Sequence, residues 1–557
     1  MLLIEPETEI YQVTHLPVVK AYADRLGLVA VINQLVPTEM EIDAGTVVLG
    51  LVLDTLSGRS PLYQLEEFFE HQDRELLLGR PVPAQAFNDD TVGRVLDRLS
   101  QCGTMKIYSE CAVRACREVG LQQQHVHFDT TSQSVYGDYR REEDQEGAIN
   151  LTYGYSKQKR PDLKQFVIAT LCVDRAVPIF GQLEDGNASD KRVNNELLTQ
   201  IAQIMARQGV APGAYIYIAD AAMVTEANLA AVGDELFITR LPASYKECDR
   251  VVQEAVQAQN WQDIGVLAET KPTKNRPVAF YQAYESQVTL YGKTYRAGVI
   301  HSSAEDQRQL KRLEREVNAS YQALEAQVVA ATRQEYFCRA DAEAAAKALI
   351  WLASEYHRVE VQVQERPNYG PGRPSLHHPR KVNQMRYGLK ADIQSREEVI
   401  QQQRQAAGCF VLLTTVPREG ELAHDAGELL RAYKEQQGVE RNFSFLKDPV
   451  IVNSLFLKRP ERLEALGLVL LLALLIWRLM ERSMRQYIAT TGRSLTGWDK
   501  KLTQRPTSLM MTSKFIGVMV IKRGDCRQLV RPLSTVQREY LQALGVSEAY
   551  FIEPRAG

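Results

Sequence analysis

The stretch VHFDTTSQSVYG at residues 126–137 reads as a β-strand that carries an aspartate in its middle. Side chains alternate between two faces from Val126 to Thr131, which is the period-two pattern of a strand with one face against a core. Aspartate is among the poorest strand formers, so the position of Asp129 requires an explanation. We expect either that the strand ends on a solvated face or that the Asp129 carboxylate is directed at a ligand.

Composition sets broad limits on this chain. Its 557 residues predict several domains, or one domain with large insertions. The net charge of −3 does not by itself indicate a nucleic-acid binder, although local basic patches rather than the total charge carry phosphate binding. The eight cysteines form no C-x-x-C pair, which favours a reduced, intracellular compartment.

One apolar run, LGLVLLLALLIW at residues 466–477, requires a comparison with membrane spans. At about 1.5 Å per residue a helix of this length covers about 18 Å, well short of the roughly 30 Å hydrocarbon core of a bilayer. We therefore predict a helix buried in the core of a soluble protein, and no membrane association.

The order of patterns along the chain predicts five regions. Helical periodicity and turn signals predict an all-α domain at 1–120, for DNA binding or dimerisation. At 121–241, three strands, a helix, a strand, a helix and a strand predict a mixed sheet with helices packed on it. An α+β insertion is expected at 242–408, the α/β pattern resumes at 409–477, and 478–557 is locally basic. The predicted fold class is therefore α/β.

Further carboxylates occupy positions suited to chemistry. Asp220 ends a predicted strand directly before a helix, and ligands of open α/β sheets gather at the carboxyl ends of strands. A helix is predicted from about 427 to 447, and Tyr433, Glu440 and Lys447 are spaced by seven, so they form one stripe along it. An adjacent apolar stripe could dock this helix on the sheet: Val439, Phe443 and Leu446. Taken singly, Asp220 fits an ordinary turn and the stripe fits a solvated helix face. Two strand aspartates and a helix glutamate together can converge on a pair of divalent cations, which suits phosphoryl transfer.

In these residues the chain resembles the DDE transposases of bacterial insertion sequences, whose catalytic core is ribonuclease H-like. The group to which it is most similar carries its glutamate in a helix with the signature Tyr-x2-Arg-x3-Glu-x6-Lys. Tyr433, Glu440 and Lys447 match this signature in register, whereas the arginine position holds Gln436. Glutamine keeps hydrogen bonding but lacks the charge and the fork of arginine. The resemblance covers most of the chain, from about residue 15 to 550.

The resemblance implies a function and a metal site. Asp129, Asp220 and Glu440 are expected to hold two Mg²⁺ ions, for which Mn²⁺ can substitute. The expected activity is cleavage of DNA at the ends of an insertion sequence, followed by transfer of the freed 3′-hydroxyls into target DNA. The implied partners are double-stranded DNA and further copies of the chain, in a homodimer or larger synaptic complex, and the implied location is the cytoplasm, at the nucleoid.

The resemblance also implies DNA contacts. Tyr433 and Lys447 are expected to contact DNA near the scissile phosphate, and Gln436 occupies the remaining contact position of the signature. Arg373 within PGRPS resembles the core of a minor-groove AT-hook, and a rigid linker is the alternative. A basic stretch near the first catalytic strand predicts phosphate contacts, against the alternative of a solvated loop. Its basic residues are Lys157, Lys159, Arg160 and Lys164.

Three functions stay open at this stage. The first is an active transposase. The second is a catalytically inactive or domesticated DNA-binding protein derived from one, and the third is a ribonuclease H-like nuclease without strand transfer. Metal-dependent cleavage separates the second from the first, and end-specific DNA binding separates the third from the first.

Overall fold

The computed structural model divides the chain into two compact units. The first unit combines Met1–Thr239 with Thr414–Gly557, and the second is Arg240–Leu413, which covers nearly the same residues as the predicted insertion. The structure describes residues 8–58, 64–136, 139, 149–157, 159–268, 278–371, 380–447, 457 and 459–556.

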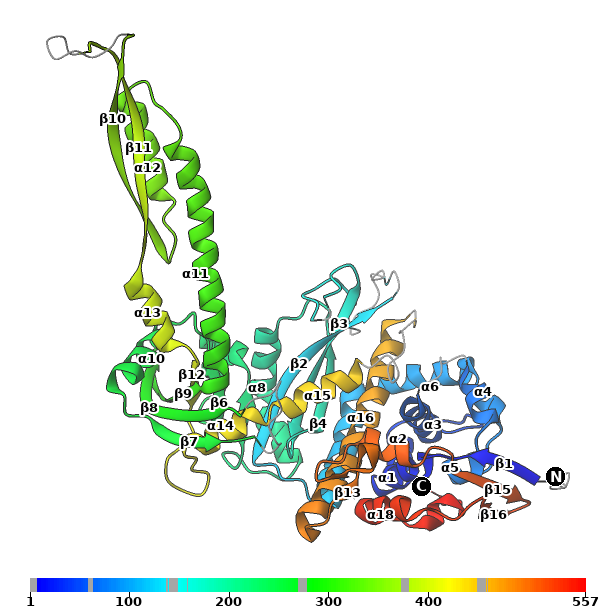
Figure 1. The fold of residues 1–557 in the computed structure, drawn as a ribbon. Coiled ribbons are helices and arrows are strands. Elements are labelled where there is room, and N and C mark those ends of the chain that lie inside the picture. The colour runs from blue at the N-terminus through cyan, green and yellow to red at the C-terminus, as the bar shows by residue number, and fades with distance from the viewer. Residues whose placement is uncertain are drawn as a thin grey trace. The chain divides into compact units, whose positions relative to one another are not determined.

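The first unit contains strands of a mixed sheet that pair in the order β4-β3-β2-β5-β6. Figure 1 labels β2, β3, β4 and β6 among them. Strand β3 pairs antiparallel with β2 on one side and with β4 on the other. Strand β5 pairs parallel with β2, and β6 pairs parallel with β5. This confirms the predicted mixed sheet flanked by helices. The strands are β2 (His125–Val135), β3 (Lys164–Val173), β4 (Val177–Glu184), β5 (Ile216–Ala219) and β6 (Leu236–Leu241).

Both faces of β2 are covered, which differs from the expected strand with a single packed face. His127 is 0% exposed and Phe128, on the opposite face, is 1% exposed. On the Phe128 side, Tyr217 of β5 donates a hydrogen bond to Asn194 of α8 (Asp190–Arg207) at 2.8 Å. The other face is covered by α15 (Gln437–Leu446), which contacts β2. The central strand is therefore buried on both sides and Asp129 does not lie on a solvated face.

The N-terminal part is helical as predicted, but it is joined to the C-terminal part of the chain. Strand β1 (Thr8–Gln12) pairs with β15 (Met519–Arg523), which in turn pairs with β16 (Cys526–Leu529). Tyr22 donates a hydrogen bond to the carbonyl of Leu544 at 3.1 Å. The N-terminal helices are α1 (Leu16–Arg25), α2 (Leu28–Leu35), α3 (Ala44–Ser57), α4 (Leu65–Glu70), α5 (Arg74–Leu78), α6 (Asp89–Cys102) and α7 (Thr104–Val119).

Helix α16 (Pro460–Thr491) forms the core between these helices and the sheet, because it contacts α3, α6, α7 and β4. Among the described residues it is the one helix long and apolar enough to cross a membrane, and 94% of its most apolar 18-residue window is buried inside the protein. The prediction of a buried core helix at 466–477 is confirmed. The other elements of the protein cover its long apolar surface.

The remaining elements of the first unit surround the sheet. They include η3 (Ala221–Met223), α9 (Glu226–Ala231), α14 (Ala426–Lys434), η4 (Trp498–Lys500), α17 (Ser508–Lys514) and α18 (Thr535–Leu544), together with the short strands β13 (Leu495–Thr496) and β14 (Leu502–Thr503).

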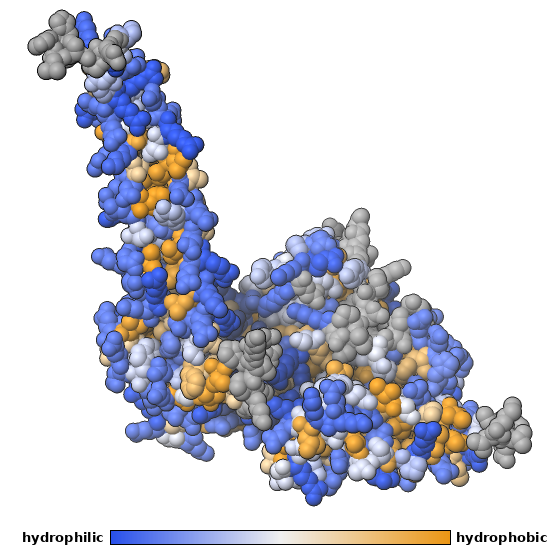
Figure 2. All heavy atoms as spheres, viewed as in Figure 1, coloured by the Kyte–Doolittle hydropathy of each residue, from blue (hydrophilic) through white to orange (hydrophobic). Residues whose placement is uncertain are grey.

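The second unit combines strands with a helical arm. Helix α11 (Ser303–Thr332) runs alongside the hairpin of β10 (His357–Tyr369) and β11 (Val382–Ser395), and α12 (Arg339–Trp351) packs on the same hairpin (Figure 1). Apolar side chains gather in patches between polar ones on this arm (Figure 2). The other elements are α10 (Lys246–Ala258), β7 (Gln262–Val266), β8 (Phe280–Leu290), β9 (Lys293–Ser302), α13 (Glu397–Ala406) and β12 (Cys409–Thr414).

Candidate active site

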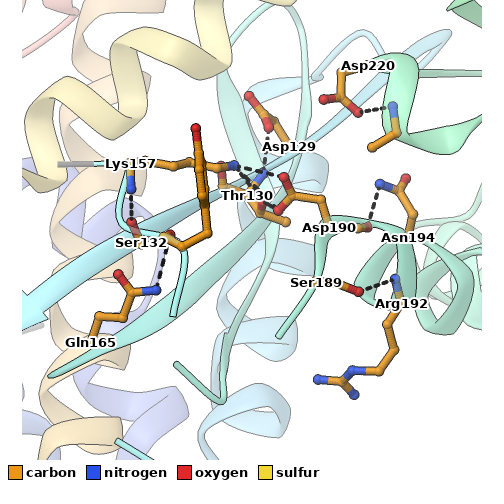
Figure 3. Close-up of polar contacts among 12 residues, drawn as sticks. Asp129, Thr130, Ser132, Lys157, Gln165, Ser189, Asp190, Arg192, Asn194 and Asp220 are labelled. Carbon is orange, nitrogen blue, oxygen red and sulfur yellow. Dashed lines mark hydrogen bonds and ion pairs between the residues drawn. The ribbon is translucent and has the colours of Figure 1, made fainter. Parts of the chain in front are cut away.

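Asp129 and Asp220 occupy equivalent positions on neighbouring parallel strands. The register of β2 and β5 sets His127 opposite Ile218. Each aspartate follows two residues later, so the same register brings the two aspartates side by side. Because side chains two residues apart point to the same face, both carboxylates project on the side of the sheet that α15 covers (Figure 3). Neighbouring strands therefore present a carboxylate pair at one place.

Burial makes this pair costly to ionise. The pKa of Asp129 is raised to about 7, first by burial and to a smaller extent by the nearby charges of Asp220 and Asp190. Lys157 and the N–H of Thr130, which donates to Asp129 at 2.7 Å, oppose that rise. The pKa of Asp220 is raised as well, first by burial and then by Asp190, against a hydrogen bond from the N–H of Ala222 at 3.0 Å. A cation bound between these carboxylates would relieve the repulsion.

A third carboxylate that the sequence did not single out, Asp190, lies beside the pair. It is the first residue of α8 and accepts a hydrogen bond from Thr130 Oγ1. The Nζ of Lys157 lies 3.3 Å from Asp190 Oδ2 and donates to the carbonyl of Thr130 at 2.7 Å (Figure 3). Acidic residues are common in the first turn of any helix, so the local pattern gave no reason to single out Asp190.

Glu440 lies in the first turn of α15, and its side chain is exposed. The apolar stripe expected beside it is buried and docks the helix on the sheet: Val439, Phe443 and Leu446. Among the residues that the structure describes, no three His, Cys, Asp or Glu side chains are grouped so that they could hold a metal ion. The structure therefore brings Asp129 and Asp220 together and leaves Glu440 outside that pair.

The predicted glutamate helix is divided in two. It was expected to run without interruption from about 427 to 447, but α14 ends at Lys434 and α15 begins at Gln437. At the junction, the N–H of Gly438 bonds to the carbonyl of Glu435 at 2.8 Å, a three-residue step that tightens the helix. Tyr433 and Glu440 therefore lie in two consecutive helical segments, and the two residues between these segments, Glu435 and Gln436, keep helical φ and ψ.

Lys447 does approach the carboxylates. It follows the last residue of α15 and is partly buried. Burial lowers the pKa of Lys447, the charge of Lys157 lowers it further, and the charge of Asp129 raises it. Two lysines thus share the electrostatic environment of Asp129.

The other predicted DNA-contact residues have varied surroundings. Arg160 pairs with Asp162 through two guanidinium nitrogens, at 2.9 and 2.7 Å, and Lys164 donates to the carbonyl of Tyr139 at 2.7 Å. Lys159 is exposed. Tyr433 and Gln436 are partly buried around the junction of α14 and α15. Arg373 lies outside the described residues.

Gly438 provides a test of how α15 is positioned. A Cβ at Gly438 would lie 2.0 Å from the carbonyl oxygen of Arg175, in the turn between β3 and β4. Replacing Gly438 with alanine is therefore expected to lower the free energy of unfolding by roughly 1–3 kcal/mol, measured by urea denaturation. Gly298→Ala is the control, because the nearest atom to its added Cβ is 4.0 Å away. Equal stability of both variants would contradict the close packing described here.

Comparisons with known proteins concern the N-terminal part of the chain. A family model described as a domain of unknown function (DUF4277) matches residues 8–113. This range contains β1 and the helices from α1 into α7, and it ends before the strand that carries Asp129. The comparison with curated proteins gives no match. The chain is therefore similar to the DUF4277 family over its N-terminal helices.

Proposed function

We propose that this protein is a transposase that cleaves DNA at the ends of an insertion sequence and transfers the freed strands into target DNA. The observation that supports the proposal most is that Asp129 of β2 and Asp220, directly after β5, each follow by two residues a pair of positions that are opposite each other in adjacent parallel strands. Partly buried carboxylates arranged in this way suit divalent cations, which need hard oxygen ligands. Double-stranded DNA is the proposed partner, in a homodimer or larger synaptic complex at the nucleoid of the cytoplasm.

The sheet supports a ribonuclease H-like core. Numbered within the core, its strands run 3-2-1-4-5, with three antiparallel strands followed by two that are parallel to the first. This is the arrangement expected of the proposed family. The carboxylates of its first and fourth strands are Asp129 and Asp220.

The residues present fit divalent metal. Asp129 and Asp220 supply oxygen ligands whose pKa values are raised, first by burial and then by neighbouring carboxylates, and Glu440 is the proposed third ligand, carried on α15. When bound, two Mg²⁺ or Mn²⁺ ions would activate a water or a 3′-hydroxyl and stabilise the leaving oxygen.

The chain's own residues would prepare this site for DNA. Asp190 and Thr130 hold the Lys157 ammonium group beside the carboxylates. Lys447 brings a second positive charge to the same place from the end of α15. Both ammonium groups would attract the phosphate that is to be cleaved, as point charges. The buried surroundings strengthen these interactions, because water screens them less.

The exposed position of Glu440 favours a second candidate function. A chain whose glutamate stays away from the aspartate pair would bind element ends without cutting them, as a DNA-binding protein derived from a transposase. Gln436, in place of the arginine of the signature, also favours this function.

An experiment separates the candidates. Purified protein is incubated with Mg²⁺ and a duplex that carries the sequences flanking its own gene, and cleaved and joined products are resolved on a sequencing gel. Cleavage and joining support a transposase. Cleavage without joining supports a nuclease, and end-specific binding without cleavage supports the inactive DNA-binding protein.

Lys447 is expected to act on binding and cleavage together. Replacing it with alanine should weaken DNA binding and reduce the slope of log affinity against log salt by about 1, because one phosphate contact is lost. Fluorescence anisotropy across a salt series measures this slope. Lys106→Ala, at an exposed position on α7, is the control. An unchanged slope would show that Lys447 does not contact phosphate.

A further inference from the structure

Arginines from separate segments of the first unit gather near the start of α15. Arg175 lies in the turn between β3 and β4, Arg441 in α15 and Arg485 in α16. Arg505 follows β14, in the C-terminal part of the chain. Positions this far apart in the sequence come together only through the fold.

Two contacts fasten the β3–β4 turn to α15 and α16. Arg482 of α16 donates to Asp174 Oδ2 at 2.5 Å. Gly438 of α15 lies directly against the backbone of Arg175, where a Cβ would be 2.0 Å from the carbonyl oxygen. The Arg175 side chain is 60% exposed, and its Nε lies 3.4 Å from Glu435 Oε1. The turn therefore holds an exposed guanidinium group at the junction of α14 and α15.

Helix α16 adds further guanidinium groups. The carboxylate of Glu481 is shared by Arg478, at 3.3 Å, and Arg485, at 2.5 Å. Arg478 also donates to Asn442 of α15 at 2.5 Å, which joins α16 to α15 one residue after Arg441. Among the described residues, no acceptor lies within hydrogen-bond distance of the buried Nε of Arg485. The Glu481 carboxylate thus forms ion pairs with two arginines, and the Nε–H group of Arg485 makes no hydrogen bond to the described residues.

The guanidinium groups repel one another. Burial lowers the pKa of Arg485, and the charges of Arg441 and Arg175 lower it further, against the attraction of Glu481. Burial also lowers the pKa of Arg505, with Arg175 adding to the effect. Like charges held together cost stability in the free protein and create a field that attracts anions.

We propose that four of these guanidinium groups bind the phosphodiester backbone of duplex DNA, and we name them the arginine cluster: Arg175, Arg441, Arg485 and Arg505. This inference rests on the proposed function, because it assigns the DNA that flanks the cleavage site to a defined surface. Backbone contacts carry no sequence information, so the arginine cluster positions DNA of any sequence.

The register of the sheet relates the arginine cluster to the carboxylate pair. Asp129 is opposite Thr170 in the pairing of β2 with β3, and Arg175 follows Thr170 by five residues. Thr170 to Val173, the last residue of β3, is three residues, or about 10 Å at about 3.3 Å per residue, and Arg175 lies in the turn beyond that end. At about 3.4 Å per phosphate, this length corresponds to about three phosphates of one DNA strand. One duplex is therefore long enough to contact both the carboxylate pair and the arginine cluster.

The test uses the full-length protein and a variant with three substitutions at exposed positions: Arg175→Gln, Arg441→Gln and Arg505→Gln. Binding to a duplex with the element ends and to an unrelated duplex of equal length is measured by fluorescence anisotropy from 50 to about 300 mM salt. We expect affinity for both duplexes to fall more than about tenfold, with a loss of about 2–3 in the log–log salt slope.

A matched variant controls for net charge. It carries Arg94→Gln, Arg117→Gln and Arg207→Gln, at exposed helical positions in the same unit. We expect this control to keep most of the affinity and of the salt slope. Equal losses in the two triple variants, or no loss in the first, would overturn the arginine cluster as a DNA-binding surface.

The outcome is separable from that of the proposed function. A wild-type protein that binds duplexes through the arginine cluster but does not cleave them would support this inference and overturn the transposase proposal. A protein that cleaves element ends and binds them equally well without the three arginines would do the reverse. A wild-type protein that binds no duplex would contradict both.

Discussion

Replacing Asp129 with alanine is expected to reduce Mg²⁺-dependent cleavage of element ends on the order of a thousandfold or more, while DNA binding persists. The substitution removes an oxygen ligand from the proposed metal site and leaves Lys157 and Lys447 in place. Asp220→Ala and Glu440→Ala should have the same effect. Cleavage rates come from single-turnover assays with labelled duplex, and binding comes from anisotropy measurements in Ca²⁺.

Asp234→Ala is a suitable control, because Asp234 is an exposed aspartate in the same unit. Retained cleavage by Asp129→Ala or Asp220→Ala would remove the basis of the transposase proposal. Retained cleavage by Glu440→Ala alone would identify another third ligand, and Asp190 is the carboxylate already beside the pair. The three variants therefore test the aspartate pair and the glutamate separately.

The second large effect concerns stability in the absence of metal. The pKa of Asp129 is about 7 in the folded protein and about 4 in an unfolded chain. Between these values the folded protein holds a proton that the unfolded chain has released, so stability falls as pH rises from about 4 to about 7. The shift corresponds to about 4 kcal/mol at most above pH 7. Asp129→Asn removes this cost, so we expect a variant more stable than wild type at pH 8.

Chemical denaturation with chelator at pH 5 and pH 8 measures this difference. We expect the advantage of Asp129→Asn to be small at pH 5 and to grow to a few kcal/mol at pH 8. Adding Mg²⁺ or Mn²⁺ at pH 8 should stabilise wild type more than the variant, since a bound cation neutralises the ionised Asp129 carboxylate, which the variant lacks. A pH-independent difference, or equal stabilisation by metal, would contradict a strained carboxylate pair that holds a cation.

Local patterns predicted much of the fold. The strand around Asp129, the strand that ends at Asp220 and the buried helix at 466–477 were each read from periodicity and length, and each is present. The docking stripe of α15 was also predicted, because apolar side chains three and four residues apart share one face of a helix. These features depend on residues close together in the chain, which is the range over which a sequence pattern is informative.

The candidate site required more than local pattern. Neighbours in sequence did not reveal that the two aspartates lie at the same level of adjacent strands, since strand register is set by the packing of the whole sheet. Asp190 was not singled out, because it looks like any acidic residue at a helix start. The junction between α14 and α15 was also missed, and next to it Gly438 contacts a turn more than 250 residues earlier, which no local pattern reveals.

The sequence alone determined which residue types are available for chemistry and which segments form strands and helices. Only the tertiary structure decided which of them meet: Asp129 with Asp220 and Asp190, and Arg175 with Arg485. The physical reason is that periodicity follows from the geometry of one backbone segment, whereas electrostatic pairing depends on distances between segments that packing alone establishes.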